Sequence, residues 1–311
     1  MKKFLVVAIV IVLVGLGGVF AGDHYRYELY DAAIAFEQDR AGLKSQTGLA
    51  GPNKFAYIET ERVEGQESII MLHGFSANKT NWIRLAQHLG SQYHLVALDL
   101  LGHGDNEQDM SRSYSIVEQV EFVKLAAAGL GIARFHLVGN SMGGAISALY
   151  SATYPEQVIT ATLISPAGVH DIPSVMDDII KDGENPLIAT TIEEFGRVID
   201  FVMVEKPYIP GPVQKVEAER SVARIEINRK IFKDIRADLD TGLQQGFASI
   251  SAPVLFVWGD QDRAINVKNI DRYASLIPNA QKKVYEDIGH LAMIEVPQRT
   301  ARDILDFIAS N

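Results

Sequence analysis

The chain has 311 residues, of which 47% are hydrophobic, and its formal net charge is −10 at pH 7. This length and apolar content suffice for one large core with an insertion. The negative charge argues against nucleic acid as a partner, because the phosphates would repel the protein. The absence of cysteine excludes disulfides and thiol chemistry, and no His-Glu-x-x-His pattern indicates a metal site. We therefore expect neither a metal nor another cofactor.

The first 22 residues include a hydrophobic segment. Lys2 and Lys3 precede nineteen uncharged residues, Phe4 to Gly22, which at about 1.5 Å per residue would nearly cross the ~30 Å hydrocarbon core of a membrane. A signal peptide cleaved near Ala21 is one interpretation. The length favours the other, an uncleaved anchor, because it exceeds the usual apolar core of about 7–15 residues. The basic amino end would stay cytoplasmic, which would place the rest of the chain on the outer, periplasmic or extracellular side.

The next segment, residues 23–50, is expected to be a stalk and linker. Residues 23–44 have helical spacing and mixed charge, whereas residues 45–52 are rich in Gly, Ser and Thr and predict a linker. From residue 51 strands alternate with helical segments, which predicts a mainly parallel sheet covered by helices on both faces. The core is expected over residues 51–170 and 248–311. Its predicted strands are Phe55–Thr60, Ser68–Leu72, Tyr93–Leu100, Phe135–Val138, Thr160–Ser165, Pro253–Trp258 and Lys282–Glu286.

The alternation of strands and helices is interrupted over residues 171–247. This stretch contains helical segments and several prolines but no clear strand. We expect it to form a helical cap, inserted between the sixth and seventh strands over the carboxyl edge of the sheet. Its apolar stretch at residues 201–204 has three possible roles: it could line a tunnel, touch a membrane or pack the cap onto the core.

A Gly-x-Ser-x-Gly pattern, from Gly139 to Gly143, follows the predicted strand Phe135–Val138 and precedes a helix of small residues. In this position the pattern is typical of a nucleophile elbow, a turn so sharp that its serine is strained and its neighbours must be small. Ser141 is therefore the predicted nucleophile. A serine hydroxyl needs a base to remove its proton, and the base needs an acid to orient it.

The base is expected after the nucleophile and the acid in the chain order of such sites. Among the eight histidines, His290 alone follows a predicted strand and turn in that order. Asp260 and Asp262 both lie in the turn after the strand Pro253–Trp258, and either could reach His290. A further histidine, His170, could line the mouth of the pocket.

Acyl transfer also needs hydrogen-bond donors for the developing oxyanion. The backbone N–H of Met142, directly after the nucleophile, is one candidate. Phe75 is the other, because it follows the pair His73-Gly74 at the end of a predicted strand, where the chain can turn its N–H toward Ser141.

On these residues the chain resembles the α/β-hydrolases with a serine triad, and it is most similar to the membrane-anchored monoacylglycerol lipases of the ABHD group. The resemblance covers roughly residues 51–311. It rests on Met71-Leu72-His73-Gly74-Phe75-Ser76-Ala77 with Trp82, on His136-Leu137-Val138-Gly139-Asn140-Ser141-Met142-Gly143-Gly144, on Pro166-Ala167-Gly168, on Trp258-Gly259-Asp260-Gln261-Asp262, and on Gly289-His290 with the helix from Gln298 to Ile308.

The resemblance implies the acid at Asp262, the base at His290 and an eight-stranded sheet. It also implies hydrolysis of a single-chain acyl ester, such as a monoacylglycerol, through an acyl-enzyme. One loop departs from the pattern: residues 102–106 read Gly-His-Gly-Asp-Asn where many relatives have Gly-His-Gly-x-Ser. The shape of this loop is therefore left open.

Two other functions are compatible with the elbow. Some carbon–carbon bond hydrolases of aromatic degradation share its Asn-Ser-Met-Gly-Gly sequence, but these enzymes typically carry a tryptophan after the base, where this chain has Leu291. A ligand-binding protein that kept the fold without turnover is the second alternative, and the intact set of predicted site residues weighs against it. Dehalogenases and epoxide hydrolases are disfavoured, because their nucleophile is an aspartate and position 141 is a serine.

Overall fold

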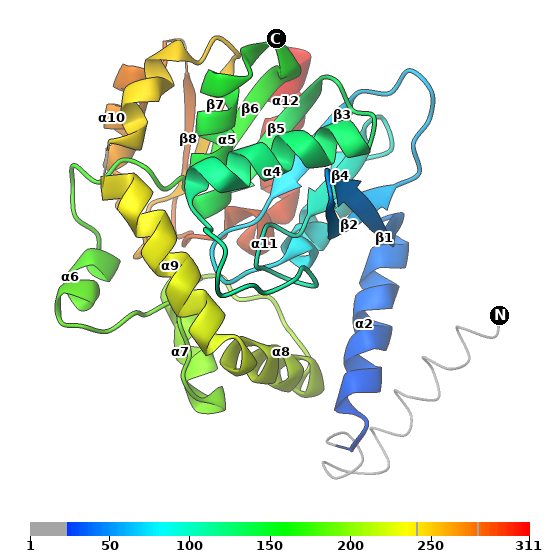
Figure 1. Cartoon of the computed structure of the whole chain (residues 1–311), viewed down its shortest axis with the longest axis vertical. Helices are drawn as coiled ribbons and strands as arrows, with labels where there is room; N and C mark the ends of the chain where they lie inside the picture. The colour runs from blue at the N-terminus through cyan, green and yellow to red at the C-terminus, as the bar shows by residue number, and fades with distance from the viewer. Residues whose placement is uncertain (1–23, 241, 279) are drawn as a thin grey trace.

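A single sheet of eight strands organises the molecule, which we describe from a computed structural model covering residues 24–240, 242–278 and 280–311 (Figure 1). The strand order is β1-β2-β4-β3-β5-β6-β7-β8. β1 pairs antiparallel with β2, and β2 pairs antiparallel with β4, whereas all other neighbours are parallel. The expected mainly parallel sheet is thereby confirmed. The strands are β1 (Leu43–Ala50), β2 (Asn53–Thr60), β3 (Ser68–Leu72), β4 (His94–Leu98), β5 (Phe135–Asn140), β6 (Val158–Ile164), β7 (Val254–Gly259) and β8 (Gln281–Tyr285).

Helices cover both faces of the sheet because its central strands are apolar on both sides. In β3, Ile70 and Leu72 belong to one hydrophobic core, and Ile69 and Met71 belong to the other. The first core also contains residues of α4 (Ile116–Gly129), α5 (Met142–Thr153) and α10 (Asn269–Leu276). The second contains residues of α3 (Ile83–Leu89), α11 (Ala292–Glu295) and α12 (Pro297–Ala309). Short 3₁₀ turns lie at η1 (Lys79–Trp82) and η2 (Pro155–Gln157).

The expected helical cap is present between β6 and β7. Figure 1 shows its helices grouped at one end of the sheet, with α9 crossing toward α8. Its elements are α6 (Val175–Lys181), α7 (Ile192–Val202), α8 (Gly211–Ala223), α9 (Ile225–Asp240) and the 3₁₀ turn η3 (Leu243–Ser249).

The predicted linker over residues 45–52 is wrong, because most of it belongs to β1. Only the end residues of β1, Leu43 and Ala50, are buried, and the middle of the strand is polar and mostly exposed. Such a strand at the edge of a sheet carries no apolar alternation that a sequence pattern could detect. Gly48 is required there because a Cβ atom would come within 2.6 Å of the ring of Phe55 on β2.

The predicted stalk is helical but does not stand free of the cap. Its helix, α2 (Arg26–Arg40), packs Tyr30 against Val213 and Val216 of α8. Arg26 also forms an ion pair of 3.0 Å with Glu219. The expected anchor or signal segment, residues 1–22, lies outside the described residues, and within the described part no helix is long and apolar enough to cross a membrane.

Candidate active site

The nucleophile elbow lies between β5 and α5, and its serine has a strained backbone. Ser141 has φ 55° and ψ −116°, a conformation that costs a non-glycine residue roughly 1–3 kcal/mol. The surrounding structure enforces it: the N–H of Ser141 donates to the carbonyl of Ile164 at 3.0 Å. A side chain at Gly139 would overlap the backbone of Gly143, and one at Gly143 would overlap the carbonyl of Leu72. The two glycines therefore allow β3, β5 and α5 to meet closely beneath Ser141.

His290 and Asp262 form a close pair at the adjoining end of the sheet. The Nδ1 of His290 lies 2.7 Å from Oδ2 of Asp262, and their side chains are only 4% and 0% exposed. Because a carboxylate accepts, Nδ1–H is the donor, and in the neutral ring Nε2 then keeps its lone pair. Asp262 also accepts from the indole of Trp258 at 3.0 Å and from two backbone N–H groups, those of Ala264 and Ile265. These donors fix the carboxylate in the orientation that the imidazole requires.

The structure separates the two aspartates that sequence reasoning left open. Asp260 accepts the backbone N–H of Asp287 at 2.8 Å and so closes the neighbouring turn. Of the two, it is Asp262 that contacts the His290 ring. The geometry thus gives Asp260 a turn role and places Asp262 where an orienting acid would stand.

Residues of the elbow and the cap hold the loop of His290, residues 287–291, here called the base loop. The side chain of Asn140 donates to the carbonyl of His290 at 3.1 Å, and it also donates to that of Ile164 at 3.2 Å. The N–H of His290 donates to the carbonyl of Val202, at the end of α7, at 2.8 Å. His290 is therefore fastened on one side to Asn140, which precedes Ser141, and on the other to the cap.

Glu295, on the short helix α11, is a site residue that the sequence patterns did not reveal. Its carboxylate accepts the N–H groups of Gly289 at 3.0 Å and Leu291 at 3.1 Å, the two neighbours of His290. The same carboxylate accepts the N–H groups of Val204 and Glu205 of the cap at 2.8 and 3.0 Å. Its position five residues after the base is the only sequence signal, and a glutamate there resembles an ordinary surface residue.

The loop that carries Phe75, residues 73–77, is here called the oxyanion loop. Nδ1 of His73 donates to the carbonyl of Gly74 at 2.7 Å, and its Nε2 accepts the N–H of Leu100 at 3.1 Å. Because a trans peptide is planar, holding the Gly74 carbonyl directs the Phe75 N–H the opposite way. Burial lowers the pKa of His73 to about 4, so the ring stays neutral and keeps this tautomer. A Cβ atom at Gly74 would lie 3.2 Å from Cβ of Ser141, so the loop passes close to the nucleophile.

Met142 is the other expected oxyanion donor. It is the first residue of α5, so its N–H is one of the four that have no acceptor within a helix. Met142 and Phe75 both line the cavity that reaches Ser141. The five predicted site residues thus all follow the carboxyl ends of parallel strands: Phe75 follows β3, Ser141 and Met142 follow β5, Asp262 follows β7, and His290 follows β8.

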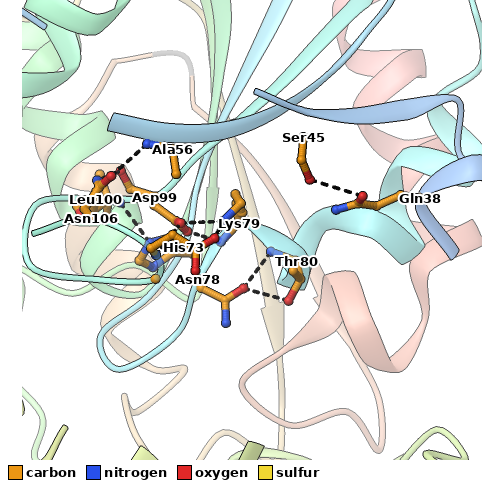
Figure 2. Close-up of polar contacts among 12 residues, drawn as sticks. Gln38, Ser45, Ala56, His73, Asn78, Lys79, Thr80, Asp99, Leu100 and Asn106 are labelled. Atoms are coloured by element: carbon orange, nitrogen blue, oxygen red, sulfur yellow. Dashed lines mark hydrogen bonds and ion pairs between the residues drawn. The ribbon is translucent and has the colours of Figure 1, made fainter. Parts of the chain in front are cut away.

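An ion cluster in which Lys79 and Asp99 are buried lies beside His73 of the oxyanion loop. Figure 2 shows His73, Lys79 and Asp99 gathered together, with Asn106 beside them. Nζ of Lys79 lies 2.6 Å from Asp99 and 2.5 Å from Asp105. Burial opposes the charge of Lys79, but the two carboxylates prevail and raise its pKa.

The departure from the family pattern at residues 102–106 is accommodated by the same cluster. Asn106 donates to the carbonyl of Asp99 at 2.6 Å and accepts the N–H of Ala56 in β2 at 2.8 Å. A side chain at Gly104 would overlap the carboxylate of Asp99. The loop therefore curls around Asp99, and its asparagine ties it to the sheet.

An apolar cavity of about 40 Å³ opens onto Ser141 between the core and the cap. This volume admits only a few waters, since one water needs about 10–15 Å³, so a larger ligand requires side chains of the cap to move. His170, which the sequence allowed at the pocket mouth, lines the cavity. The apolar stretch at residues 201–204 does not, and residues 201–203 are buried in packing. The lining residues are Phe75, Ser141, Met142, Ala167, His170, Met176, Leu187, Phe232, Ile235, Arg236, Leu239, Ala264 and Ile265.

The sequence resembles those of known proteins over most of its length. The sequence profile of the α/β-hydrolase fold family matches residues 67–297. Lipase 1 of Psychrobacter immobilis is 36% identical over 273 residues, which cover 86% of this chain and 85% of that protein. Monoacylglycerol lipase ABHD6 of Homo sapiens is 31% identical over 268 residues, which cover 83% of this chain and 80% of that protein.

A solved structure is similar over the whole length. The crystal structure of a membrane phospholipase A, described as a bacterial virulence factor, has a TM-score of 0.89 and 36% sequence identity, and the match covers 100% of this chain and 99% of that one. The sequence and the overall fold therefore both match hydrolases of this fold. The chain belongs to the α/β-hydrolase fold family and is an ester hydrolase within it.

Proposed function

We propose that the chain is a lipase that hydrolyses single-chain lipid esters, such as monoacylglycerols, with Ser141 as nucleophile, His290 as base and Asp262 as orienting acid. The observation that carries the proposal is the 2.7 Å contact between His290 and Asp262 beside the strained elbow of Ser141. This contact leaves Nε2 of the imidazole as the group that can take a proton from a serine hydroxyl.

Acylation and deacylation use the same three side chains. Oγ of Ser141 attacks the ester carbonyl carbon while its proton passes to Nε2 of His290, and Asp262 stabilises the imidazolium. The N–H groups of Phe75 and Met142 bind the oxyanion. The C–O bond to the alcohol then breaks, and the alcohol leaves with the proton from His290. Water, deprotonated by His290, then attacks the acyl carbon. The bond from that carbon to Oγ of Ser141 breaks, Oγ takes the proton back from His290, and the carboxylic acid leaves.

The substrate class follows from the cavity and the relatives. Apolar side chains such as Met176, Phe232 and Leu239 line the space next to Ser141, which suits a hydrocarbon chain better than a polar acyl group. The lipase and monoacylglycerol lipase among the relatives act on lipids by their names. Because the cavity is narrow, the acyl chain of a substrate enters only when the cap side chains that line the cavity move aside.

The test is hydrolysis of p-nitrophenyl esters with two to sixteen acyl carbons and of a monoacylglycerol, by the full chain and by its Ser141→Ala variant. We expect activity that rises toward medium or long chains and that is lost in the variant without loss of folding. Folded protein that hydrolyses no ester would refute the proposal and favour the carbon–carbon hydrolase or the ligand-binding alternative. Appreciable activity of the variant would refute Ser141 as nucleophile.

We further propose that residues 1–22 remain attached as a membrane anchor, with the catalytic part on the outer side. The length of the uncharged stretch Phe4 to Gly22 supports this, and a lipid substrate partitions into the bilayer where the anchor would hold the enzyme. Amino-terminal sequencing of protein recovered from washed membranes should find Met1 or the residues directly after it. Recovery of soluble protein that begins near residue 22 would show cleavage instead.

A further inference from the structure

One asparagine of the cap contacts the oxyanion loop. Asn228 lies in the first turn of α9, is only 1% exposed, and donates through Nδ2 to Oγ of Ser76 at 3.0 Å. Ser76 directly follows Phe75, whose N–H is the proposed oxyanion donor. The hydrogen bond joins residues 152 positions apart in sequence and links the cap to the most strained part of that loop.

Ser76 needs an external constraint because its backbone is left-handed. Its φ is 59°, a region that costs a non-glycine residue roughly 1–2 kcal/mol. Released from its partner, Ser76 would relax toward negative φ and rotate the adjoining peptide groups. The peptide that contains the Phe75 N–H is one residue away, and its Gly74 carbonyl, besides the bond from His73, accepts the N–H of Ala77 at 3.4 Å. This turn spans Ser76, so it ties the direction of that peptide to the conformation at Ser76.

The same helix lines the acyl cavity. Phe232, Ile235 and Leu239 line the space beside Ser141. Asn228 precedes them at helical spacing of four, seven and eleven residues, so it lies on the same face of α9. The ring of Phe232 also lies 5.3 Å from that of Phe75, between centroids. α9 therefore presents apolar side chains to the cavity and, in its first turn, the polar side chain of Asn228 to the oxyanion loop.

A second contact fixes the start of α9 next to this loop. Arg224, which precedes the helix, donates through Nη1 to the carbonyl of Gly104 at 3.2 Å and through Nη2 to that of Gly102. Both glycines flank His103, whose ring centroid lies 5.1 Å from that of His73. The first turn of α9 is thus held against the residues that support the oxyanion loop, and Asn228 is carried with it.

We propose that Asn228 is a positioning residue for the oxyanion hole, acting through Ser76 on the direction of the Phe75 N–H. The oxyanion hole is then complete only while α9 rests on the oxyanion loop, so closure of the cap over an acyl chain and assembly of the catalytic site are one event. This inference rests on the proposed ester hydrolysis.

The experiment measures kcat and KM of the full chain on a short p-nitrophenyl ester, which does not need the acyl cavity. Asn228→Leu removes the hydrogen bond at similar volume, and Ser76→Ala removes it from the other side while keeping the strain. Each should lower kcat about tenfold and change KM less than about twofold, because a misdirected oxyanion donor weakens transition-state binding alone. The double variant should be no worse than either single one.

Ser76→Gly separates positioning from a merely structural role. Glycine adopts φ near 59° without strain, so Ser76→Gly should keep kcat within about threefold of the wild type. Adding Asn228→Leu to Ser76→Gly should then change kcat less than about twofold. Ile227→Val, a buried neighbour outside the cavity, is the control for general loosening of the cap and should leave kcat unchanged.

Two results would overturn the inference: an unchanged kcat in folded Asn228→Leu and Ser76→Ala, or an equal loss from Asn228→Leu in the wild-type and Ser76→Gly backgrounds. If Asn228→Leu fails to fold, Ser76→Ala against Ser76→Gly still tests the same bond. Wild-type protein inactive on every ester would instead count against the proposed function, so the two failures are distinguishable.

Discussion

The nucleophile elbow is held by contacts between backbone atoms, whereas the cap reaches the site through hydrogen bonds. At the elbow, Gly143 lets α5 lie directly against the carbonyls of Leu72 and His73. At the cap, the contacts are Asn228 to Ser76 and the carbonyl of Val202 to His290. Backbone atoms in direct contact leave no room for movement, whereas single hydrogen bonds can break and re-form. The elbow is therefore expected to stay fixed while the oxyanion and base loops respond to the cap.

The largest effect is expected from Gly143→Ala. The new methyl group would overlap two backbone carbonyls, which cannot move without displacing β3. We expect a loss of at least about 3 kcal/mol in the free energy of unfolding, measured by chemical denaturation, together with loss of activity. The matched control is Gly196→Ala in α7, where nothing lies within 4 Å of the new atom. That change should raise stability by about 0.5–1 kcal/mol, and comparable losses in both variants would contradict the contrast.

Glu295→Gln tests the hydrogen bonds of the base loop. The amide keeps the shape of the carboxylate but replaces one oxygen with an NH2 donor, so one of the two backbone N–H groups beside His290, that of Gly289 or that of Leu291, loses its acceptor. We expect kcat to fall about 10- to 100-fold, by analogy with the loss of outer-shell partners at metal sites, with a smaller effect on stability. Glu286→Gln, at an exposed position beside the same loop, should leave kcat unchanged.

The pH dependence of stability should reveal the buried His73. Burial lowers its folded pKa to about 4, below the ordinary 6.5, so between these values the unfolded chain binds more protons. The free energy of unfolding should therefore fall as pH drops from about 6.5 toward 4, by about 3 kcal/mol from this residue. The free energy of unfolding, measured by chemical denaturation across this pH range, should change less with pH in His73→Asn than in the wild type. An identical slope in both proteins would show that His73 is not buried in its neutral form.

The smallest effect concerns the contact between α2 and the cap. Tyr30 donates to Glu217 of α8 at 2.5 Å, and burial of this carboxyl raises its pKa. Tyr30→Phe should lower the free energy of unfolding by about 1–2 kcal/mol, because it leaves a buried polar group without its donor. Hydrolysis of a short ester should be unchanged. Tyr25→Phe, at an exposed position on the same segment, is the control and should change neither quantity.

Much of the fold was predictable because local patterns determine it. The runs that form β3, β5 and β7 are buried along their whole length. The Gly-x-Ser-x-Gly spacing is also recognisable, because one sharp turn leaves no room for side chains at its glycines. β1 escaped prediction because an exposed edge strand needs no apolar face. Asn228 and Glu295 escaped for a different reason. The side chain of Asn228 donates to Ser76, and that of Glu295 accepts backbone N–H groups of the cap. Both partners are distant in sequence, and nothing in the residues next to Asn228 or Glu295 indicates them.

The most direct test of the central claim is rapid-quench mass spectrometry of the protein mixed with a medium-chain p-nitrophenyl ester. If Ser141 is the nucleophile, the protein should gain the mass of one acyl group within the first turnover, and digestion should place that group on Ser141. Ser141→Ala should gain none. Turnover without an acylated protein, or an acyl group on any other residue, would contradict the proposed mechanism.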